Sequence, residues 1–272
     1  MSKLENTVFI PALVMKTFVE NFTVERISSA ADLFITSAII LVFAAPFAIF
    51  ASKALSKDKY IQNIYTYGLA FSNFGFMGNA VVNSLFPEIF FEYLIFTLPL
   101  WILIYLWGVP VLLMSDAGKK QTLKERLKAF VNPMFAAMLI GMVIGIFEIP
   151  LPAFFTSLVK SASDCMSPVA MLLTGIVVSS ISLKKTFTSI RLYIISILRL
   201  VVMPLIFMGI AMFLKMDETV YICAVCSLAM PLGLNTIVIP SGLGKDTTDA
   251  AGMAVISHLL SCITIPIIFA LI

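Results

Sequence analysis

The residues best suited to chemistry in this sequence are amides and glycines inside an apolar run, residues 67–83, which reads YGLAFSNFGFMGNAVVN. A glycine costs about 1 kcal/mol in a helix interior, and an amide without a partner in hydrocarbon is also costly. A segment that only anchors a protein in a membrane would not carry three of each. Interrupted transmembrane helices tolerate such residues where their freed backbone groups line a cavity or bind a ligand. The stretch therefore predicts a binding site at a broken helix.

A second stretch of the same kind is residues 227–240, SLAMPLGLNTIVIP. Pro231 lacks a backbone donor and Gly233 follows it closely, so the helix should break here, with Asn235 at the break. Two broken helices that cross near the bilayer midplane would bring two half-helix N-termini together. Their unpaired N–H groups and partial positive charges favour a carboxylate or a similar anion. The alternative is that these residues only allow close helix packing.

Composition places both stretches in a membrane. Hydrophobic residues make up 60% and charged residues 12% of the chain, against roughly 45–50% and 25% in ordinary globular proteins. So little polar surface cannot cover so much apolar side chain in water, and we predict an all-α polytopic membrane protein. The net charge of +3 is small and the lysines fall in short loops, so we expect no nucleic-acid partner. Residues 1–13 do not resemble a signal peptide.

A window of about 19 residues predicts nine membrane crossings. Their approximate limits are 5–20, 32–53, 60–85, 88–114, 131–149, 154–181, 190–213, 218–241 and 248–271. If these crossings alternate, thirteen Lys and Arg residues lie on one side and four on the other, while Arg199 lies within a span. The positive-inside rule then predicts a cytoplasmic N-terminus and an external C-terminus in the plasma membrane.

Four landmarks recur at an offset of about 157 residues, which indicates an internal repeat. The pairs are Pro11 and Pro168, Pro46 and Pro204, Asn79 and Asn235, and Pro110 and Pro266. A repeat unit with an odd number of helices would invert the second copy, as in many secondary transporters. Segment 131–149 has no counterpart in the first copy, so we expect the chain to be one N-terminal helix short of two five-helix units.

These motifs carry a family resemblance. Residues 71–81, FSNFGFMGNAV, resemble the fourth-helix signature of the auxin efflux carrier family, which includes the plant PIN carriers and bacterial carboxylate permeases. Residues 229–239 resemble the ninth-helix signature and residues 251–266 the last helix, and Asn132-Pro133 and Pro168 also fall where the family has them. The resemblance covers nearly the whole chain. It implies ten helices in two inverted five-helix repeats, from which the absent first helix is a departure.

The resemblance also implies a substrate site where the two broken helices cross. It gives the crossover positions to Asn73, Gly75, Gly78, Pro231 and Asn235, and we add Asn79 and Gly233 as expected substrate-binding residues. Ser72 stands where PIN carriers have proline, which predicts a softer first break. The implied units are scaffold segments at 1–30 and 131–185, transport-unit halves at 31–114 and 186–272, and a cytoplasmic loop at 115–130. The scaffold side would also form a homodimer.

Isolated polar residues elsewhere are weaker candidates. Arg199, His258 and Asp164 are considered for ion or proton coupling. Against this, Arg199 would snorkel to the cytoplasmic face, His258 would be a buried, hydrogen-bonded side chain, and Asp164 would lie near the external interface. Cys223 and Cys226 match a redox CxxC spacing, but at helical spacing in an apolar run we interpret them as buried small hydrophobes. Residues 241–247 evoke a phosphate loop but lack its first glycine, so we expect a cytoplasmic turn.

The leading functional hypothesis is a secondary transporter of small organic anions, not an enzyme. The resemblance suggests malate- or malonate-like carboxylates or an auxin-like acid, carried by an elevator motion. A membrane-embedded enzyme would need clustered His, Asp, Glu or Cys, which the sequence does not offer, and no charged ring or filter repeat indicates a channel. A non-transporting membrane binding or sensor protein of the same fold remains the alternative. We expect no cofactor or metal, and the sequence leaves the coupling ion, H⁺ or Na⁺, open.

Overall fold

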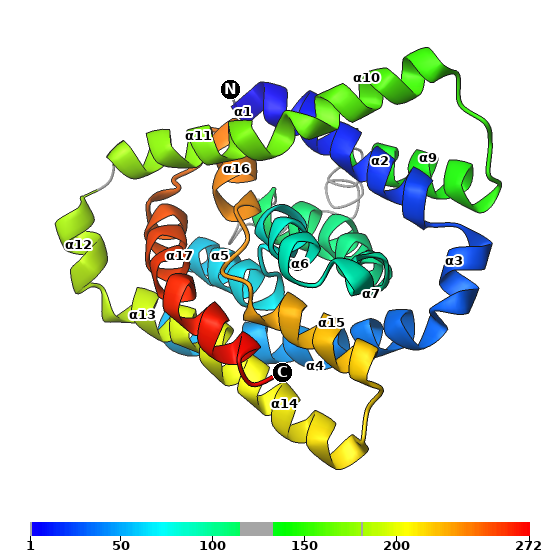
Figure 1. The fold of residues 1–272 in the computed structure, drawn as a ribbon. Coiled ribbons are helices and arrows are strands. Elements are labelled where there is room, and N and C mark those ends of the chain that lie inside the picture. The colour runs from blue at the N-terminus through cyan, green and yellow to red at the C-terminus, as the bar shows by residue number, and fades with distance from the viewer. Residues whose placement is uncertain (1, 115–132, 181) are drawn as a thin grey trace.

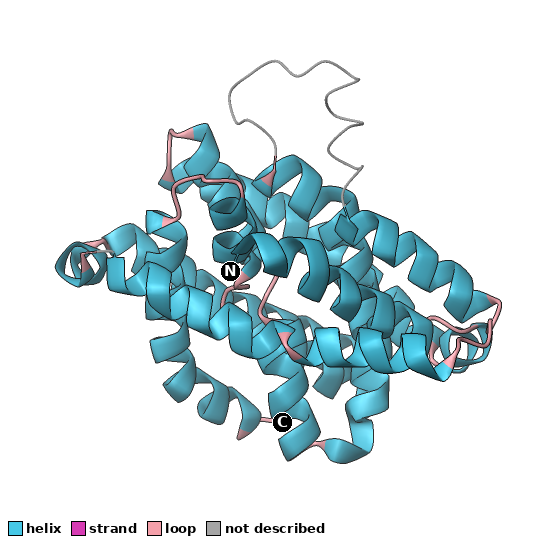
Figure 2. Cartoon of the chain, turned by 90° about the horizontal axis from the view of Figure 1, so that it is seen from above, coloured by secondary structure: helices cyan, strands magenta, loops and turns pink. Residues whose placement is uncertain are grey.

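A computed structural model describes residues 2–114, 133–180 and 182–272. Within these ranges the regular elements are helices, and the one β-type pairing is an isolated bridge between Ser72 and Leu232 (Figure 2). The all-α prediction is therefore confirmed for the described residues. The cytoplasmic loop predicted at 115–130 lies outside them.

In the described part of the chain, four continuous helices are long and apolar enough to cross a membrane. They are α4 (Ala31–Leu55); the run of η3 (Pro87–Ile89), α7 (Phe90–Leu103) and η4 (Ile104–Leu113); the run of α13 (Ile190–Ile197), η5 (Leu198–Val202) and α14 (Met203–Leu214); and α17 (Thr248–Phe269). Each coincides closely with a predicted crossing, because each is an apolar run long enough to span the hydrocarbon core of a bilayer.

Local π-helical turns in these long helices lie beside prolines. The turn η4 contains Pro110, and η5 ends two residues before Pro204. A proline inside a helix removes one N–H donor and clashes with the carbonyl four residues earlier, so the preceding turn widens. One consequence is that Arg199 lies on a widened turn, in the middle of its span.

The two stretches richest in Gly, Pro and Asn are each split into two helices. The first half is α5 (Lys59–Ala70), and after Phe71–Asn73 the chain resumes as η2 (Phe74–Gly78) and α6 (Asn79–Leu85). The second is α15 (Glu218–Ala229), followed after 230–234 by α16 (Asn235–Gly242). Both α5 and α15 begin at an aspartate cap: Asp58 accepts a hydrogen bond from the N–H of Ile61, and Asp217 from that of Val220.

The remaining helices are shorter. They are α1 (Ser2–Leu4), η1 (Glu5–Phe9), α2 (Ile10–Asn21), α3 (Val24–Ser29), α9 (Pro133–Ile146), α10 (Ala153–Asp164), α11 (Met166–Ser180) and α12 (Leu183–Thr188). The predicted crossing at 154–181 is thus two helices that meet at Cys165. Pro168, three residues later, lacks an N–H donor and interrupts regular helical bonding. A Cβ on Gly145 would lie 2.6 Å from the carbonyl oxygen of Phe18, so glycine allows α9 to pack closely on α2.

The helices form two groups (Figure 1). The helices α2, α9 and α10 pack on one another and lie with α11 along one side of the molecule. The helices α4, α5 and α7, together with α13, α14, α15 and α17, form the larger group, and the two split stretches meet at its centre. The core therefore surrounds the point where the two helix breaks cross.

Candidate functional site

The breaks of the two split helices touch in an antiparallel crossing. Ser72 and Leu232 form the bridge, and the N–H of Asn73 donates to the carbonyl of Pro231 at 2.7 Å. Met230 is extended (φ −68°, ψ 147°) because it precedes a proline, which disfavours the helical conformation there. The hydroxyl of Ser72 donates to the carbonyl of Ser227 at 2.7 Å. The first break, expected to be soft because it lacks proline, is therefore held by a side-chain hydrogen bond.

Both half-helices that leave the crossing start beside it. The N–H of Met77 donates to the carbonyl of Asn73, and the N–H of Ile237 to that of Leu234, so helical bonding begins at these two residues. The N–H groups of each first turn have no acceptor within their own helix. With them comes about half a positive charge at each N-terminus. Two such ends converge on the crossing, an arrangement suited to an anion.

Two buried asparagines line the crossing, and the amide nitrogen of each has a different side-chain partner. The Nδ2 of Asn73 lies 3.2 Å from Nε2 of His258, and the Nδ2 of Asn235 donates to the Tyr67 hydroxyl at 2.9 Å. The Oδ1 atoms of Asn73 and Asn235 are buried and have no hydrogen-bond partner among the described residues. Buried polar atoms are normally paired, so these two oxygens mark a place where a further group fits.

A small cavity lies between these groups. It has a volume of about 10 Å³, room for a single water, and is lined by both asparagines, Gly75, Gly233 and an aromatic wall that includes Tyr67 and Trp101. A Cβ on Gly75 would lie 2.6 Å from Cζ2 of Trp101, so the indole presses directly on the first helical turn. A ligand larger than water therefore requires Trp101 or a half-helix to move.

Arg199 lies on the opposite side of the crossing from the half-helix N-termini. It is 1% exposed; its Nη1 donates to the carbonyl of Leu69 at 2.9 Å and its Nη2 to that of Ser227 at 3.3 Å. Both carbonyls belong to the last turns of α5 and α15, which carry partial negative charge. The guanidinium thus caps the two helices that enter the crossing, and it does not snorkel to a membrane face.

Three other predicted site residues, Gly78, Asn79 and Asp164, lie outside the cavity. Gly78 lies one turn past the crossing against the Tyr93 hydroxyl, and Asn79 follows it in α6 without lining the cavity. Asp164 lies at the exposed end of α10, where it forms ion pairs with Lys160 at 2.9 Å and Lys16 at 3.7 Å.

Sequence reasoning missed six residues that line the cavity, among them the aromatic side chains of Tyr67 and Trp101. Tyr67 opens the apolar stretch that contains Asn73, and a phenol hydroxyl in an apolar run needs a partner, so its signal was present. Trp101 lies on α7, and nothing in its local sequence indicates contact with Gly75.

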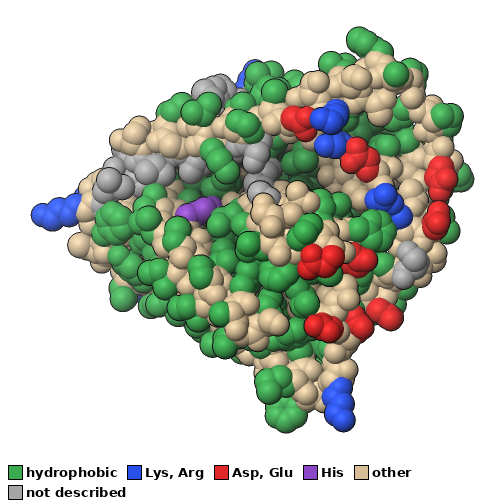
Figure 3. Space-filling model, viewed as in Figure 1, with side chains coloured by type: hydrophobic (Ala, Val, Ile, Leu, Met, Phe, Trp, Pro, Cys, Tyr) green, Lys and Arg blue, Asp and Glu red, His purple; other side chains and the backbone are tan. Residues whose placement is uncertain are grey.

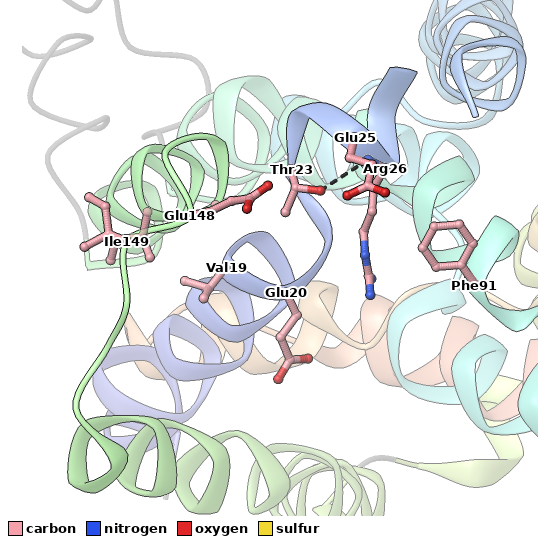
Figure 4. A pocket seen from close by; sticks show the side chains of 10 residues that line it. Val19, Glu20, Thr23, Glu25, Arg26, Phe91, Glu148 and Ile149 are labelled. Carbon is pink, nitrogen blue, oxygen red and sulfur yellow. Dashed lines mark hydrogen bonds between the residues drawn. The ribbon is translucent and has the colours of Figure 1, made fainter. Parts of the chain in front are cut away.

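A larger hollow of about 630 Å³ lies away from the crossing, between α2, α3, the end of α9 and α7 (Figure 4). Its charged lining is Glu20, Glu25, Glu148 and Arg26, and the guanidinium lies 4.8 Å from the Phe91 ring centroid and donates to Asn21 at 2.7 Å. With three carboxylates and one guanidinium, this hollow repels an anion. The crossing is therefore the better candidate site.

Long apolar helices and a buried crossing of two helix breaks define a multi-pass membrane protein whose candidate site lies within the apolar core. The chain matches the family described as membrane transport protein over residues 1–269, and it belongs to that family, the auxin efflux carriers. This is a family of transporters, not of enzymes. A comparison with curated proteins gives no match.

Proposed function

We propose that the protein is a secondary active transporter that carries a small organic anion through the crossing of its two broken helices. The observation that carries this proposal is the convergence of two half-helix N-termini and two buried asparagines on one cavity, at the antiparallel contact of Ser72 with Leu232. A carboxylate there gains charge-assisted hydrogen bonds from backbone N–H groups. The site itself contains no carboxylate that would repel it.

An inverted repeat is supported by the matching anatomy of the two split stretches. The helices α5 and α15 each have 12 residues, and their aspartate caps, Asp58 and Asp217, are 159 residues apart. A two-fold axis through the crossing would exchange Ser72 and Leu232, which are 160 residues apart. Both offsets lie close to the value of about 157 given by the four sequence landmarks.

An elevator motion is supported by the grouping of the helices. The helices α2, α9 and α10 pack mainly on one another and would form the scaffold. The larger group holds both half-helix pairs, so the whole site would move with it as one unit. The larger hollow at Arg26 and Phe91 lies between α2 of the first group and α7 of the second, which is where such units would slide.

The cavity wall favours a ligand with one carboxylate and an apolar body. Trp101 and Phe74 pack edge to face with ring centroids 5.1 Å apart, and Trp101 stacks on Tyr105 at 5.9 Å. Aromatic side chains bury large apolar areas and stack on planar groups. We therefore rank an auxin-like aromatic acid before malate or malonate.

The test is binding of indole-3-acetate, malate and malonate to the purified protein. We expect Asn73→Ala to weaken binding of the preferred anion by about 10- to 100-fold, equivalent to about 1.5–3 kcal/mol, because one buried polar partner is lost. Asn83→Ala is the matched control, since Asn83 is exposed in α6 and lies outside the cavity. Equal losses of affinity in the two variants would mean that residues 67–83 serve helix packing and do not bind the anion.

The alternative function is a membrane binding or sensor protein of the same fold. The small volume of the cavity favours it only if the two groups of helices cannot move against one another. Purified protein in sealed vesicles distinguishes the two functions. Anion binding with uptake supports the transporter, and binding without flux supports the sensor.

A further inference from the structure

The hydrogen bonds of His258 fix where its proton lies. The Nδ1 atom is 2.8 Å from the carbonyl oxygen of Ala254, which can only accept, so Nδ1 carries a hydrogen. The Nε2 atom faces the Nδ2 of Asn73, which can only donate, so this Nε2 is unprotonated. With the amide in this orientation His258 is neutral, and the Oδ1 of Asn73 is the buried atom left without a partner.

The opposite orientation of the same amide requires the opposite charge state. If Nε2 gains a proton it becomes a donor, while Nδ1 stays bound to Ala254. The amide of Asn73 must then turn over so that Oδ1 accepts from His258, and its NH₂ group takes the place of the oxygen at the cavity. The charge of His258 therefore decides whether Asn73 offers an acceptor or a donor to a ligand.

We propose that the crossing binds a proton at Nε2 of His258 together with each carboxylate, and that the side chain of Asn73 couples the two. This inference rests on the proposed function and names its coupling ion. With His258 neutral, the oxygen of Asn73 repels a carboxylate. With His258 protonated, the amide donates to the carboxylate and the imidazolium balances its charge, so a monocarboxylate and a proton cross the membrane as a neutral pair.

Asn235 provides a contrast within the same site. Its partner is the Tyr67 hydroxyl, which can donate as well as accept. The amide of Asn235 can therefore turn over without any change of protonation. The imidazole of His258 has no such freedom, and this makes Asn73 the residue that depends on a proton.

Among the described residues the ring of His258 bonds to Asn73 and to the carbonyl of Ala254, so no carboxylate of the protein balances a charge on it. The helix α17 packs against α5, α11, α12, α13, η5, α15 and α16. The ionisable groups on these elements and on α17 are Lys59, Tyr60, Tyr65, Tyr67, Lys184, Lys185, Arg191, Tyr193, Arg199, Glu218, Tyr221, Cys223, Cys226, Asp249 and Cys262. The carboxylate on α17, Asp249, lies nine residues before His258, about 13 Å along the helix. It accepts a hydrogen bond from the Tyr65 hydroxyl at 2.9 Å.

One edge of the imidazole reaches the outer surface of the larger helix group. His258 is half-buried, and Figure 3 shows the histidine, in purple, at the surface of this face. Its outer neighbours on α17, Leu259 and Cys262, are exposed. The ring therefore connects the outside of the larger helix group to the buried amide of Asn73.

The experiment uses two readings on the full-length protein. His258 is the only histidine, so its ¹⁵N imidazole signals are unambiguous. We expect the neutral form to carry hydrogen on Nδ1, and saturating indole-3-acetate to raise the pH at which Nε2 becomes protonated. In parallel, the Kd for indole-3-acetate should increase about tenfold per pH unit above that midpoint, because binding and protonation are linked. His258→Gln should abolish this slope, and Asn83→Ala should keep it.

The outcomes separate the two proposals. Anion binding that is independent of pH, or an equal slope in His258→Gln, overturns the coupling and leaves the transport proposal standing. Binding that follows Na⁺ and not pH does the same. If none of the three anions binds at any pH while His258 titrates, the transport proposal fails and the coupling fails with it. A midpoint raised by indole-3-acetate in the wild type but not in Asn73→Ala supports the coupling.

Discussion

Replacing Arg199 by methionine tests the cap on the two helices that enter the crossing. Methionine retains an unbranched, apolar side chain, shorter than that of arginine, with no charge and no donors. The substitution leaves the carbonyl of Leu69 without its guanidinium partner, whereas the carbonyl of Ser227 still accepts from Ser72. The loss therefore falls mainly on α5.

Two opposing effects set the size of the change. Each hydrogen bond from a charged donor contributes about 1.5–3 kcal/mol, so the two bonds together represent about 3–6 kcal/mol. Removing the charge also removes its desolvation cost, since Arg199 is 1% exposed, and this recovers part of the loss. We expect a net destabilisation of about 2–4 kcal/mol. Arg199→Lys should fall between methionine and the wild type, because one ammonium cannot match the fork of the guanidinium.

The assay is thermal unfolding of the purified protein in detergent, where this loss should lower Tm by roughly 5–15 °C. Arg191→Met is the matched control, because Arg191 is exposed on α13 within the same long helix, and such a site should change stability by less than about 0.5 kcal/mol. If Arg199→Met unfolds at the wild-type temperature, the guanidinium does not hold the two helix ends together. Backbone contacts alone would then hold the crossing together.

Two further predictions concern packing and topology. Gly75→Ala should destabilise the protein by about 1–3 kcal/mol, because the new Cβ would lie 2.6 Å from Trp101. Gly209→Ala is the control, since its Cβ would meet nothing within 4 Å and the substitution should be neutral or slightly stabilising. Equal Tm values for the two variants would contradict the close contact. Single cysteines at 54–58 should react with an impermeant label from the cytoplasmic side and those at 24–28 and 214–217 from outside, as the positive-inside rule predicts. Labelling of 24–28 and 54–58 from one side would overturn the proposed orientation.

The sequence by itself determined the class of protein and the places where helices fail. An apolar content of 60% excludes a water-soluble fold. Pro231 with Gly233, and the amides around Asn73, disrupt helical bonding through local geometry, and the structure has its breaks at 71–73 and 230–234. Such features are legible in sequence because a backbone donor is missing, or a side chain competes for it, within a few residues.

The sequence was less informative where one apolar window hid two helices. The turn at Cys165 divides the predicted crossing at 154–181, because hydropathy averages over a window and does not register a local interruption of helical bonding. The sequence repeat pairs Asn79 with Asn235, but only Asn235 lines the cavity, because the helix that contains Asn79 has already left the crossing by one turn.

Only the tertiary structure decided which partner each buried polar group has. Arg199 binds the carbonyl of Leu69, 130 residues away, and His258 meets Asn73 across 185 residues. Sequence shows that a buried donor or acceptor needs a partner, since leaving one unpaired costs about 1–3 kcal/mol. It does not show which partner, because that choice depends on how helices far apart in the chain pack against one another. The chemistry of this site is set by those long-range pairings, and above all by the contact of the single histidine with an amide at the crossing.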